Sequence, residues 1–314
     1  MKHPICITLG DPAGIGPEIT LKALKEIKLH HGIVIILHES LVANFFHHFE
    51  IRPFKGDVKK NKIYYILNKR KHHLQQKQDD PNNALFAYDS LLTAFEVCKK
   101  YNMSLVTAPI SKAGFKAAKI PYTGHTTLLK TYFNAPNASM AFHSDKLAIV
   151  LATIHIPLST VEQSLSTKQL QSTFNNAALM ASHLSIKSPR IGVAGLNPHA
   201  SENGQFGTFE TSVLKPAISS TKLERGELIG PISPDVIFRQ AAQNEYDIVI
   251  AMYHDQGLIP LKLLAFDSAV NVTIGLPICR TSPDHGTAYD IAGKNIANPS
   301  SMIAAINYAI SIGT

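Results

Sequence analysis

Short apolar blocks alternate with longer segments of periodic apolar residues along this chain. Continuous apolar blocks are typical of strands that helices cover on both faces, whereas a spacing near 3.6 residues is typical of helices. The pattern predicts strands at residues 5–9, 33–37, 63–67, 104–109, 147–153, 190–196, 247–252 and 270–274. It predicts helices from Pro17 and at 84–100, 167–184, 233–244 and 299–312, with a short helix entered through 122–129. Strands that alternate with helices indicate an α/β fold with a largely parallel, doubly wound sheet.

The length of 314 residues and the hydrophobic content of 45% allow one large domain or two modest ones. No apolar run approaches the roughly 20 residues that a membrane span needs, so we expect no membrane partner. The three cysteines, Cys6, Cys98 and Cys279, are odd in number and far apart. This spacing argues against a disulfide framework or a CxxC metal site and is typical of a reducing compartment, so we expect a cytoplasmic protein.

The formal net charge of +7 comes from one stretch of the chain. Residues 55–77, the basic segment, hold eight Lys or Arg residues and a single acid, Asp57. No recognisable nucleic-acid module accompanies these charges, so we interpret the segment as solvated surface, with a polyanion contact as the alternative. Histidines in surface-type stretches are also expected to be solvated: His30, His31, His47, His48, His72 and His73.

Three histidines each follow the end of a predicted strand: His155, His199 and His254. In open α/β sheets, ligands bind beyond the carboxyl ends of the strands. Three neutral imidazoles with open positions would make a site for a divalent metal ion such as Zn²⁺ or Co²⁺. Their separations are too long for a zinc finger or a helical pair, so a structural role for each histidine is the alternative.

The segment from Tyr253 to Lys294 also holds Lys262, Asn271 and Arg280 in mostly apolar surroundings. An unpaired buried charge costs several kcal/mol, roughly, so these side chains need partners. Arg binds phosphate or carboxylate with two hydrogen bonds, and Lys adds a point charge, which predicts an anion site. Surface exposure of each charge is the alternative.

Further donors could come from His125 and Thr126 at a helix start, where backbone N–H groups attract anions. Asp235 in GPISPD is either a helix-start residue or a catalytic acid or base. The stretch GDPAGIGPE lacks the G-x-G-x-x-G spacing, and no Walker sequence appears, so these residues alone name no nucleotide cofactor.

Several motifs together resemble the 4-hydroxythreonine-4-phosphate dehydrogenase family of vitamin B6 biosynthesis. They are GDPAGIGPE, TAPISK, GHT, NPHA, GPISPD, YHDQGLIPLK and VNVTIGLPICRTSPDHGTAYDIAGK, and they extend from Thr8 to Lys294. HGTAYDIAG is also similar to the cofactor loop of isocitrate and isopropylmalate dehydrogenases. The resemblance implies two α/β/α subdomains of that type. The first would comprise 1–134 with 281–314, and the second, 135–280, would carry the metal ligands and the dimer contacts.

The resemblance also implies roles for individual residues. The divalent metal, Zn, Mg or Co, would be bound across a homodimer interface by His155, His199 and His254. The phosphorylated substrate would be bound by His125, Thr126, Lys262, Asn271 and Arg280. NAD or NADP would lie near His285, Gly286 and Asp290. Enzymes of the family oxidise 4-phosphohydroxy-L-threonine, and the β-keto acid formed loses CO₂ to give 3-amino-2-oxopropyl phosphate. Candidates for the general base are Asp235, Lys262 and a metal-bound hydroxide.

The chain departs from the family pattern beside the expected site. Thr127 stands where the family has an acid, Ser201 where it has Gly, and Phe209 precedes Glu210 where it has two acids. The substrate could therefore be a related four-carbon acid phosphate, erythronate or threonate phosphate. The same fold could also support a metal-dependent lyase or hydrolase, or a catalytically inactive binding protein.

Overall fold

The computed structural model describes residues 4–68 and 70–312, so Lys69 of the basic segment lies outside the described residues. The chain divides into two compact units. Unit 1 comprises Met1–Asn134 and Leu276–Thr314, and unit 2 comprises Ala135–Gly275. We expected the second boundary after residue 280. The structure instead groups 276–280 with unit 1, where Arg280 begins a strand that pairs with Leu105.

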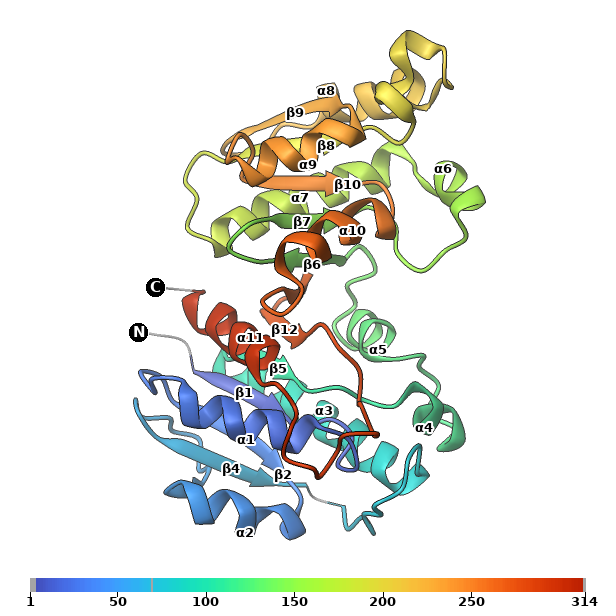
Figure 1. The fold of residues 1–314 in the computed structure, drawn as a ribbon. Helices are drawn as coiled ribbons and strands as arrows, with labels where there is room; N and C mark the ends of the chain where they lie inside the picture. The colour runs from blue at the N-terminus through green and yellow to red at the C-terminus, as the bar shows by residue number, and fades with distance from the viewer. Residues whose placement is uncertain (1–3, 69, 313–314) are drawn as a thin grey trace. The chain divides into compact units, whose positions relative to one another are not determined.

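The helices and strands of unit 1 are β1 (Ile5–Thr8), α1 (Gly16–Glu26), β2 (Ile33–Leu37), α2 (Glu39–His48), β3 (Ile51–Pro53), β4 (Ile63–Leu67), α3 (Pro81–Tyr101), β5 (Ser104–Thr107), α4 (Lys112–Ala117), α5 (His125–Tyr132), β12 (Arg280–Pro283) and α11 (Ser300–Ser311). The strands are parallel, in the order β3-β4-β2-β1-β5-β12. The connections β1-to-β2 and β4-to-β5 run in opposite directions across this sheet. Right-handed crossovers therefore place α1 and α3 on opposite faces, and α11 packs beside α1 (Figure 1).

Local sequence explains where α3 begins and ends. The Asp80 side chain accepts a hydrogen bond from Asn82 N (2.8 Å), and Pro81 occupies the first turn. Asn102 ends the helix in the left-handed conformation, with φ of 49°. The predicted helix at 84–100 omitted the polar first turn, because apolar periodicity does not detect capping residues.

The elements of unit 2 are β6 (Ser139–His143), β7 (Ala148–Leu151), a 3₁₀ turn (Leu158–Thr160), α6 (Val161–Ser164), α7 (Thr167–His183), β8 (Arg190–Ala194), a turn (Pro198–Gly204), a π-helical turn (Glu210–Leu214), α8 (Lys215–Ser220), β9 (Glu227–Ile232), α9 (Pro234–Ala242), β10 (Ile248–Ala251), α10 (His254–Ala265) and β11 (Val270–Ile274). The strand order is β11-β6-β7-β10-β8-β9. β6 is antiparallel to both of its neighbours, β11 and β7, and the other pairs are parallel.

The core of unit 2 joins its sheet to two helices on one face. Phe142 and Ile149 from the strands pack with Ile237 of α9 and Leu261 of α10. α7 covers the opposite face, because the β7-to-β8 and β9-to-β10 connections cross the sheet in opposite directions (Figure 1). Because β7, β8 and β10 are parallel, their carboxyl ends lie at the same edge of the sheet, and the turns that follow them begin there.

The prediction of a largely parallel α/β fold is confirmed, and each of the eight predicted strands is present. The pattern did not predict a helix at 254–265, where Gly257 and Pro260 lower helix propensity. Burial of Leu258 and Leu261 in the core stabilises α10 despite them. Within 4–68 and 70–312, no helix has both the length and the apolar character that a bilayer crossing requires.

Candidate active site

In unit 1, the turn after β1 approaches the turn after β5 closely. Gly10 has φ of +68°, and a Cβ on it would lie 2.1 Å from Pro109 O, so only glycine fits here. Asp11 N donates to the same carbonyl at 2.8 Å. The glycine-rich motif therefore brings the carboxyl ends of β1 and β5 together at one edge of the unit.

The same turn binds the loop after β12. The Asp11 carboxylate, 1% exposed, accepts hydrogen bonds from the Tyr289 hydroxyl (2.7 Å) and Ala13 N (2.9 Å). Ile15 N donates to Thr287 O at 2.9 Å. Burial raises the pKa of Asp11, and burial together with Asp11 raises the pKa of Tyr289 to about 12. Tyr289 therefore stays protonated at neutral pH and donates to the carboxylate.

The predicted cofactor residues lie in this anchored loop. His285, Gly286 and Asp290 are exposed. A Cβ on Gly286 would meet no heavy atom within 4 Å, so open space adjoins the loop. The loop is therefore fixed at Thr287 and Tyr289 and accessible at the three residues that the family resemblance assigns to the cofactor.

A cationic cluster in unit 1 contains Arg280, His125 and Lys112. The Arg280 guanidinium is 3% exposed and donates from Nη2 to Thr107 Oγ1 at 2.7 Å. Burial lowers the pKa of Arg280 to about 10, which leaves it charged at neutral pH. Burial, with Arg280 and Lys112 nearby, holds the pKa of His125 well below its usual value, so this imidazole is neutral. His125 Nε2 is buried and has no hydrogen-bond partner among the described residues. This cluster is chemically suited to an anion.

Sequence reasoning missed Lys112, although it lies in the quoted TAPISK motif. Thr126, the second residue of α5, is half-buried. The Thr127 hydroxyl accepts from Thr123 N and donates to Gly124 O, both at 3.1 Å. Thr127 thus closes the turn that leads into α5.

In unit 2, His155 and His254 lie together. Their ring centroids are 5.3 Å apart, with 47° between the ring planes. His155 follows β7, and His254 is the first residue of α10. His254 Nδ1 is 2.6 Å from Asp255 Oδ1, which leaves Nε2 of His254 as the nitrogen that can bind a ligand. This arrangement places two imidazoles from remote segments of one chain side by side.

His199 does not complete that pair within one chain. It lies in the turn after β8, where residues 199–203 all have positive φ, from 42° to 65°. Considering 4–68 and 70–312, no group of three or more His, Cys, Asp or Glu is arranged to hold a metal ion. Within one chain, the structure therefore brings together His155 and His254 without His199.

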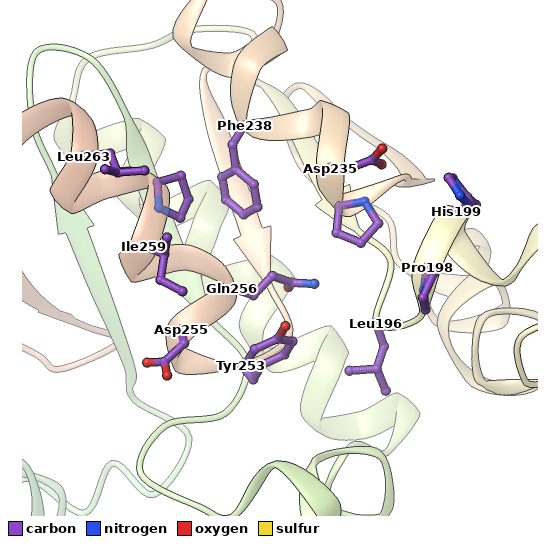
Figure 2. A pocket seen from close by; sticks show the side chains of 12 residues that line it. Leu196, Pro198, His199, Asp235, Phe238, Tyr253, Asp255, Gln256, Ile259 and Leu263 are labelled. Carbon is purple, nitrogen blue, oxygen red and sulfur yellow. The ribbon is translucent and has the colours of Figure 1, made fainter.

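His199 instead lines a pocket of about 670 Å³ within unit 2, together with Asp235. Figure 2 shows these two side chains on one side of the pocket, Ile259 and Leu263 on the other, and the Gln256 amide pointing between them. The hydrogen bond from Ser233 Oγ, with a smaller effect of His199, lowers the pKa of the exposed Asp235. Asp235 is therefore ionised at neutral pH and is a weak general base.

The remaining predicted substrate residues also lie in unit 2. Lys262 is half-buried on α10, with Nζ 5.3 Å from the centroid of the Phe266 ring. Asn271 lies on β11, and its Oδ1 is buried without a hydrogen-bond partner among the described residues. Such an acceptor suits a ligand that brings an N–H or O–H donor.

One face of α10 exposes large apolar side chains. Leu263 is 81% exposed, Phe266 70% and Ile259 60%. Contiguous exposed apolar surface of this kind marks an interaction site in soluble proteins. Because Ile259 and Leu263 also line the pocket that contains His199, this face adjoins the candidate site.

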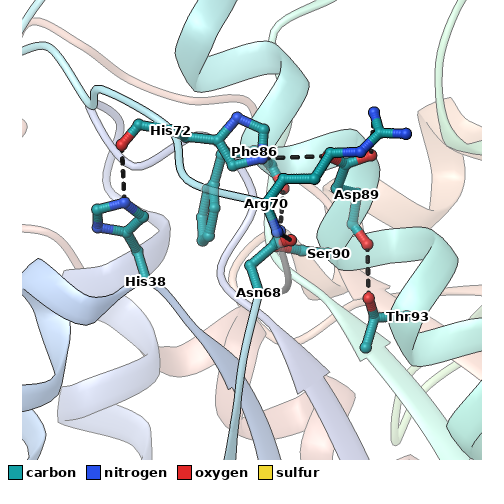
Figure 3. Close-up of polar contacts among 8 residues, drawn as sticks. All are labelled: His38, Asn68, Arg70, His72, Phe86, Asp89, Ser90 and Thr93. Atoms are coloured by element: carbon teal, nitrogen blue, oxygen red, sulfur yellow. Dashed lines mark hydrogen bonds and ion pairs between the residues drawn. The ribbon is translucent and has the colours of Figure 1, made fainter.

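The basic segment is mainly surface, as predicted: Lys55, Lys59, Lys60, Lys71 and Lys77 are exposed. Two of the histidines that we expected to be solvated are not, because His31 is 3% exposed and the His72 side chain 6%. His72 Nε2 lies 3.1 Å from Asp89 Oδ2, and His38 Nε2 donates to His72 O at 2.9 Å (Figure 3). Burial lowers the pKa of His72 despite the opposing effect of Asp89. These contacts hold His72 of the segment against α3 and against the start of α2.

Ser201 is strained, and replacing it with glycine is expected to stabilise the protein by about 1 kcal/mol. Its φ is 65°, it is 1% exposed, and its Oγ is buried without a partner among the described residues. Urea unfolding of Ser201→Gly would measure the gain. Ala200→Gly relieves backbone strain but removes no hydroxyl, so its gain should be smaller. A less stable Ser201→Gly variant would contradict this account of the turn.

The similarity of this chain to known proteins includes residues of both units. Residues 27–309 match the family described as pyridoxal phosphate biosynthetic protein PdxA. A 4-hydroxythreonine-4-phosphate dehydrogenase of Beijerinckia indica is 37% identical over 98% of this chain and 95% of its own length. A D-threonate 4-phosphate dehydrogenase of Salmonella typhimurium is 36% identical, covering 98% of each chain. The crystal structure of 4-hydroxythreonine-4-phosphate dehydrogenase from Klebsiella pneumoniae has a TM-score of 0.88 at 33% identity, covering 99% of this chain and 98% of its own.

Proposed function

Because this chain belongs to the family of the pyridoxal phosphate biosynthetic protein PdxA, we propose that it is an NAD(P)-linked dehydrogenase acting on 4-phosphohydroxy-L-threonine. The observation that carries this proposal is the cluster of Arg280, His125 and Lys112, which unites two residues assigned to the substrate by the family resemblance. The oxidised product is a β-keto acid, and its loss of CO₂ gives 3-amino-2-oxopropyl phosphate.

The cluster in unit 1 would bind the substrate phosphate. Arg280 is held in place by Thr107 before any ligand arrives, so little side-chain entropy is lost on binding. Neutral His125 would donate a hydrogen bond, and Thr126 would add a donor at the start of α5. Binding energy from this remote phosphate would position the reacting carbon. Lys262 and Asn271 keep their expected substrate roles in unit 2.

A divalent metal ion, Zn, Mg or Co, is part of the proposal. His155 and His254 fit two of its ligands, because the rings lie 5.3 Å apart and Asp255 orients the His254 ring. We assign the third ligand to His199 of a second copy of the chain. A bound divalent ion lowers the pKa of a coordinated alcohol, which is the chemistry that this oxidation requires.

A homodimer with shared active sites follows from this assignment. The exposed apolar face of α10 adjoins the pocket that His199 and Asp235 line, so a second copy seated there would cover apolar surface and contribute both side chains. Asp235 and Lys262 remain the candidates for moving the hydroxyl proton. Asp235 is already ionised at neutral pH, as proton acceptance requires.

NAD or NADP would bind beside the loop that holds His285, Gly286 and Asp290, because Asp11 and Tyr289 fix this loop next to open space.

We place the reaction in the cytoplasm, where the three free cysteines stay reduced. Burial raises the pKa of Cys279 to about 12 and raises that of Cys98, so these thiols are unreactive.

Threonate 4-phosphate is the second candidate substrate, favoured by the D-threonate 4-phosphate dehydrogenase relative and by the departure at Thr127. Asn271 Oδ1 favours the first candidate, because the amino group of 4-phosphohydroxy-L-threonine supplies a charged donor.

Steady-state rates of NAD(P)H formation with each substrate test the proposal. We expect kcat/KM at least about tenfold higher for 4-phosphohydroxy-L-threonine, a difference of roughly 1.4 kcal/mol. Dialysis against a chelator should abolish turnover, and added Zn²⁺, Co²⁺ or Mg²⁺ should restore it. No NAD(P)H with either substrate would refute the assignment.

A further inference from the structure

Glu210 is a fully buried carboxylate whose hydrogen bonds all reach one turn. Oε1 accepts from Leu196 N (2.9 Å) and Asn197 N (2.7 Å), and Oε2 accepts from Asn197 Nδ2 (3.1 Å). None of the ion pairs formed by the described residues includes it. Burying a carboxylate costs free energy. Among the hydrogen bonds of the described residues, these three N–H donors are the ones that offset this cost. These bonds therefore tie the Glu210 side chain to the backbone at Leu196 and Asn197.

That turn leads directly into a strained backbone. His199 has φ of 52° and ψ of 29°, and the next four residues also have positive φ. Non-glycine residues in this conformation cost roughly 1 kcal/mol each, so such a run persists only where its surroundings hold it. Gly195 helps, because a Cβ there would lie 2.8 Å from Ala200 Cα and 3.4 Å from Glu210 Oε1. Glu210 and Ala200 thus both lie against Gly195.

Gln256 makes a second connection at the same place. It is 8% exposed, its Oε1 accepts from Met252 N (2.7 Å), and its Nε2 donates to Gly195 O (2.7 Å). Gln256 lies two residues after His254 on α10. Its side chain therefore joins the end of β8, which leads to His199, with the end of β10, which leads to His254.

We infer that Glu210 and Gln256 are positioning residues for the metal ligands, with Glu210 fixing the left-handed turn that presents His199. The inference rests on the proposed metal-binding role of His199. Glu210 touches neither substrate nor metal in this assignment. Its effect passes through the backbone of Leu196 and Asn197, at the point where the chain leaves β8. The departure from the family pattern at Phe209 does not affect this contact. Phe209 is buried at 1% exposure, and the hydrogen bonds to Leu196 and Asn197 come from Glu210.

Glu210→Gln tests the inference, because glutamine keeps the size and loses the charge and one acceptor. Zn²⁺ affinity, measured by competition with a chromophoric chelator, should fall by about 10- to 100-fold, as for other residues that orient metal ligands. The visible spectrum of the Co²⁺-loaded protein should change, while the KM for NAD(P)⁺ and the dimer content stay at wild-type values. Glu202→Gln removes an exposed acid from the same turn and serves as the matched control, with unchanged Zn²⁺ affinity.

If Glu210→Gln does not fold, Gln256→Met provides the same measurement at the second connection, with the same expected loss. Wild-type Zn²⁺ affinity and an unaltered Co²⁺ spectrum in a folded variant would overturn the inference alone. Absence of Zn²⁺, Co²⁺ and Mg²⁺ binding by the unmodified chain would overturn the proposed metal-dependent function together with it. The two failures are therefore distinguishable in one set of titrations.

Discussion

Replacing His254 with alanine should lower kcat/KM by about a thousandfold, because loss of a metal ligand removes roughly 4 kcal/mol of transition-state stabilisation. His199→Ala should have the same effect, although His199 lies in a different turn from the pair formed by His155 and His254. Both variants should remain folded, since neither histidine belongs to the hydrophobic core of unit 2. The exposed His73 provides a control, and His73→Ala should retain full activity.

Mixing the two inactive variants should restore activity if the site is shared between copies. In a mixed dimer, one site receives His155 and His254 from the His199→Ala chain and His199 from the other chain. Random pairing through a twofold interface would then give about a quarter of wild-type turnover. Co-expression of the two variants with different affinity tags would isolate the mixed dimer, which should have half the wild-type sites. Complete inactivity of that mixed dimer would show that the three histidines do not divide between copies in this way.

Arg280→Ala should raise KM for the phosphorylated substrate by about 100-fold, because a bidentate charged contact contributes up to roughly 3 kcal/mol. If Arg280 binds phosphate equally in the ground and transition states, kcat should change little. Arg280→Lys keeps the charge but loses the planar guanidinium that can donate two parallel hydrogen bonds, so a smaller rise in KM of about tenfold is expected. Steady-state kinetics over a range of substrate concentrations would measure both.

The control for this prediction is Arg225→Ala, which removes an exposed arginine of unit 2 and should leave KM unchanged. Circular dichroism should accompany the kinetics, because Arg280 is buried against Thr107 and its removal also affects packing. An unchanged KM in a folded Arg280→Ala protein would exclude Arg280 from phosphate binding.

Some failures of local prediction have a clear physical origin. β6, Ser139–His143, has a mixed sequence and is antiparallel, so neither an apolar run nor strict alternation marked it. α10 contains Gly257 and Pro260 and forms because its apolar face packs on the unit 2 core. His72 looked like surface in a basic segment, but Asp89 binds it from a helix 17 residues further along.

Sequence by itself determined the elements whose pattern is local. Strand β2, Ile33–Leu37, was predicted to the residue, because a continuous apolar run covered by helices is written in consecutive positions. The motifs also identified candidate ligands and a family. Tertiary structure alone decided which of them meet: Asp11 binds Tyr289 across 278 residues, and His155 pairs with His254 while His199 stays apart. Such contacts depend on crossovers and strained turns that bring remote strand ends to one edge, and no spacing along the chain records that geometry.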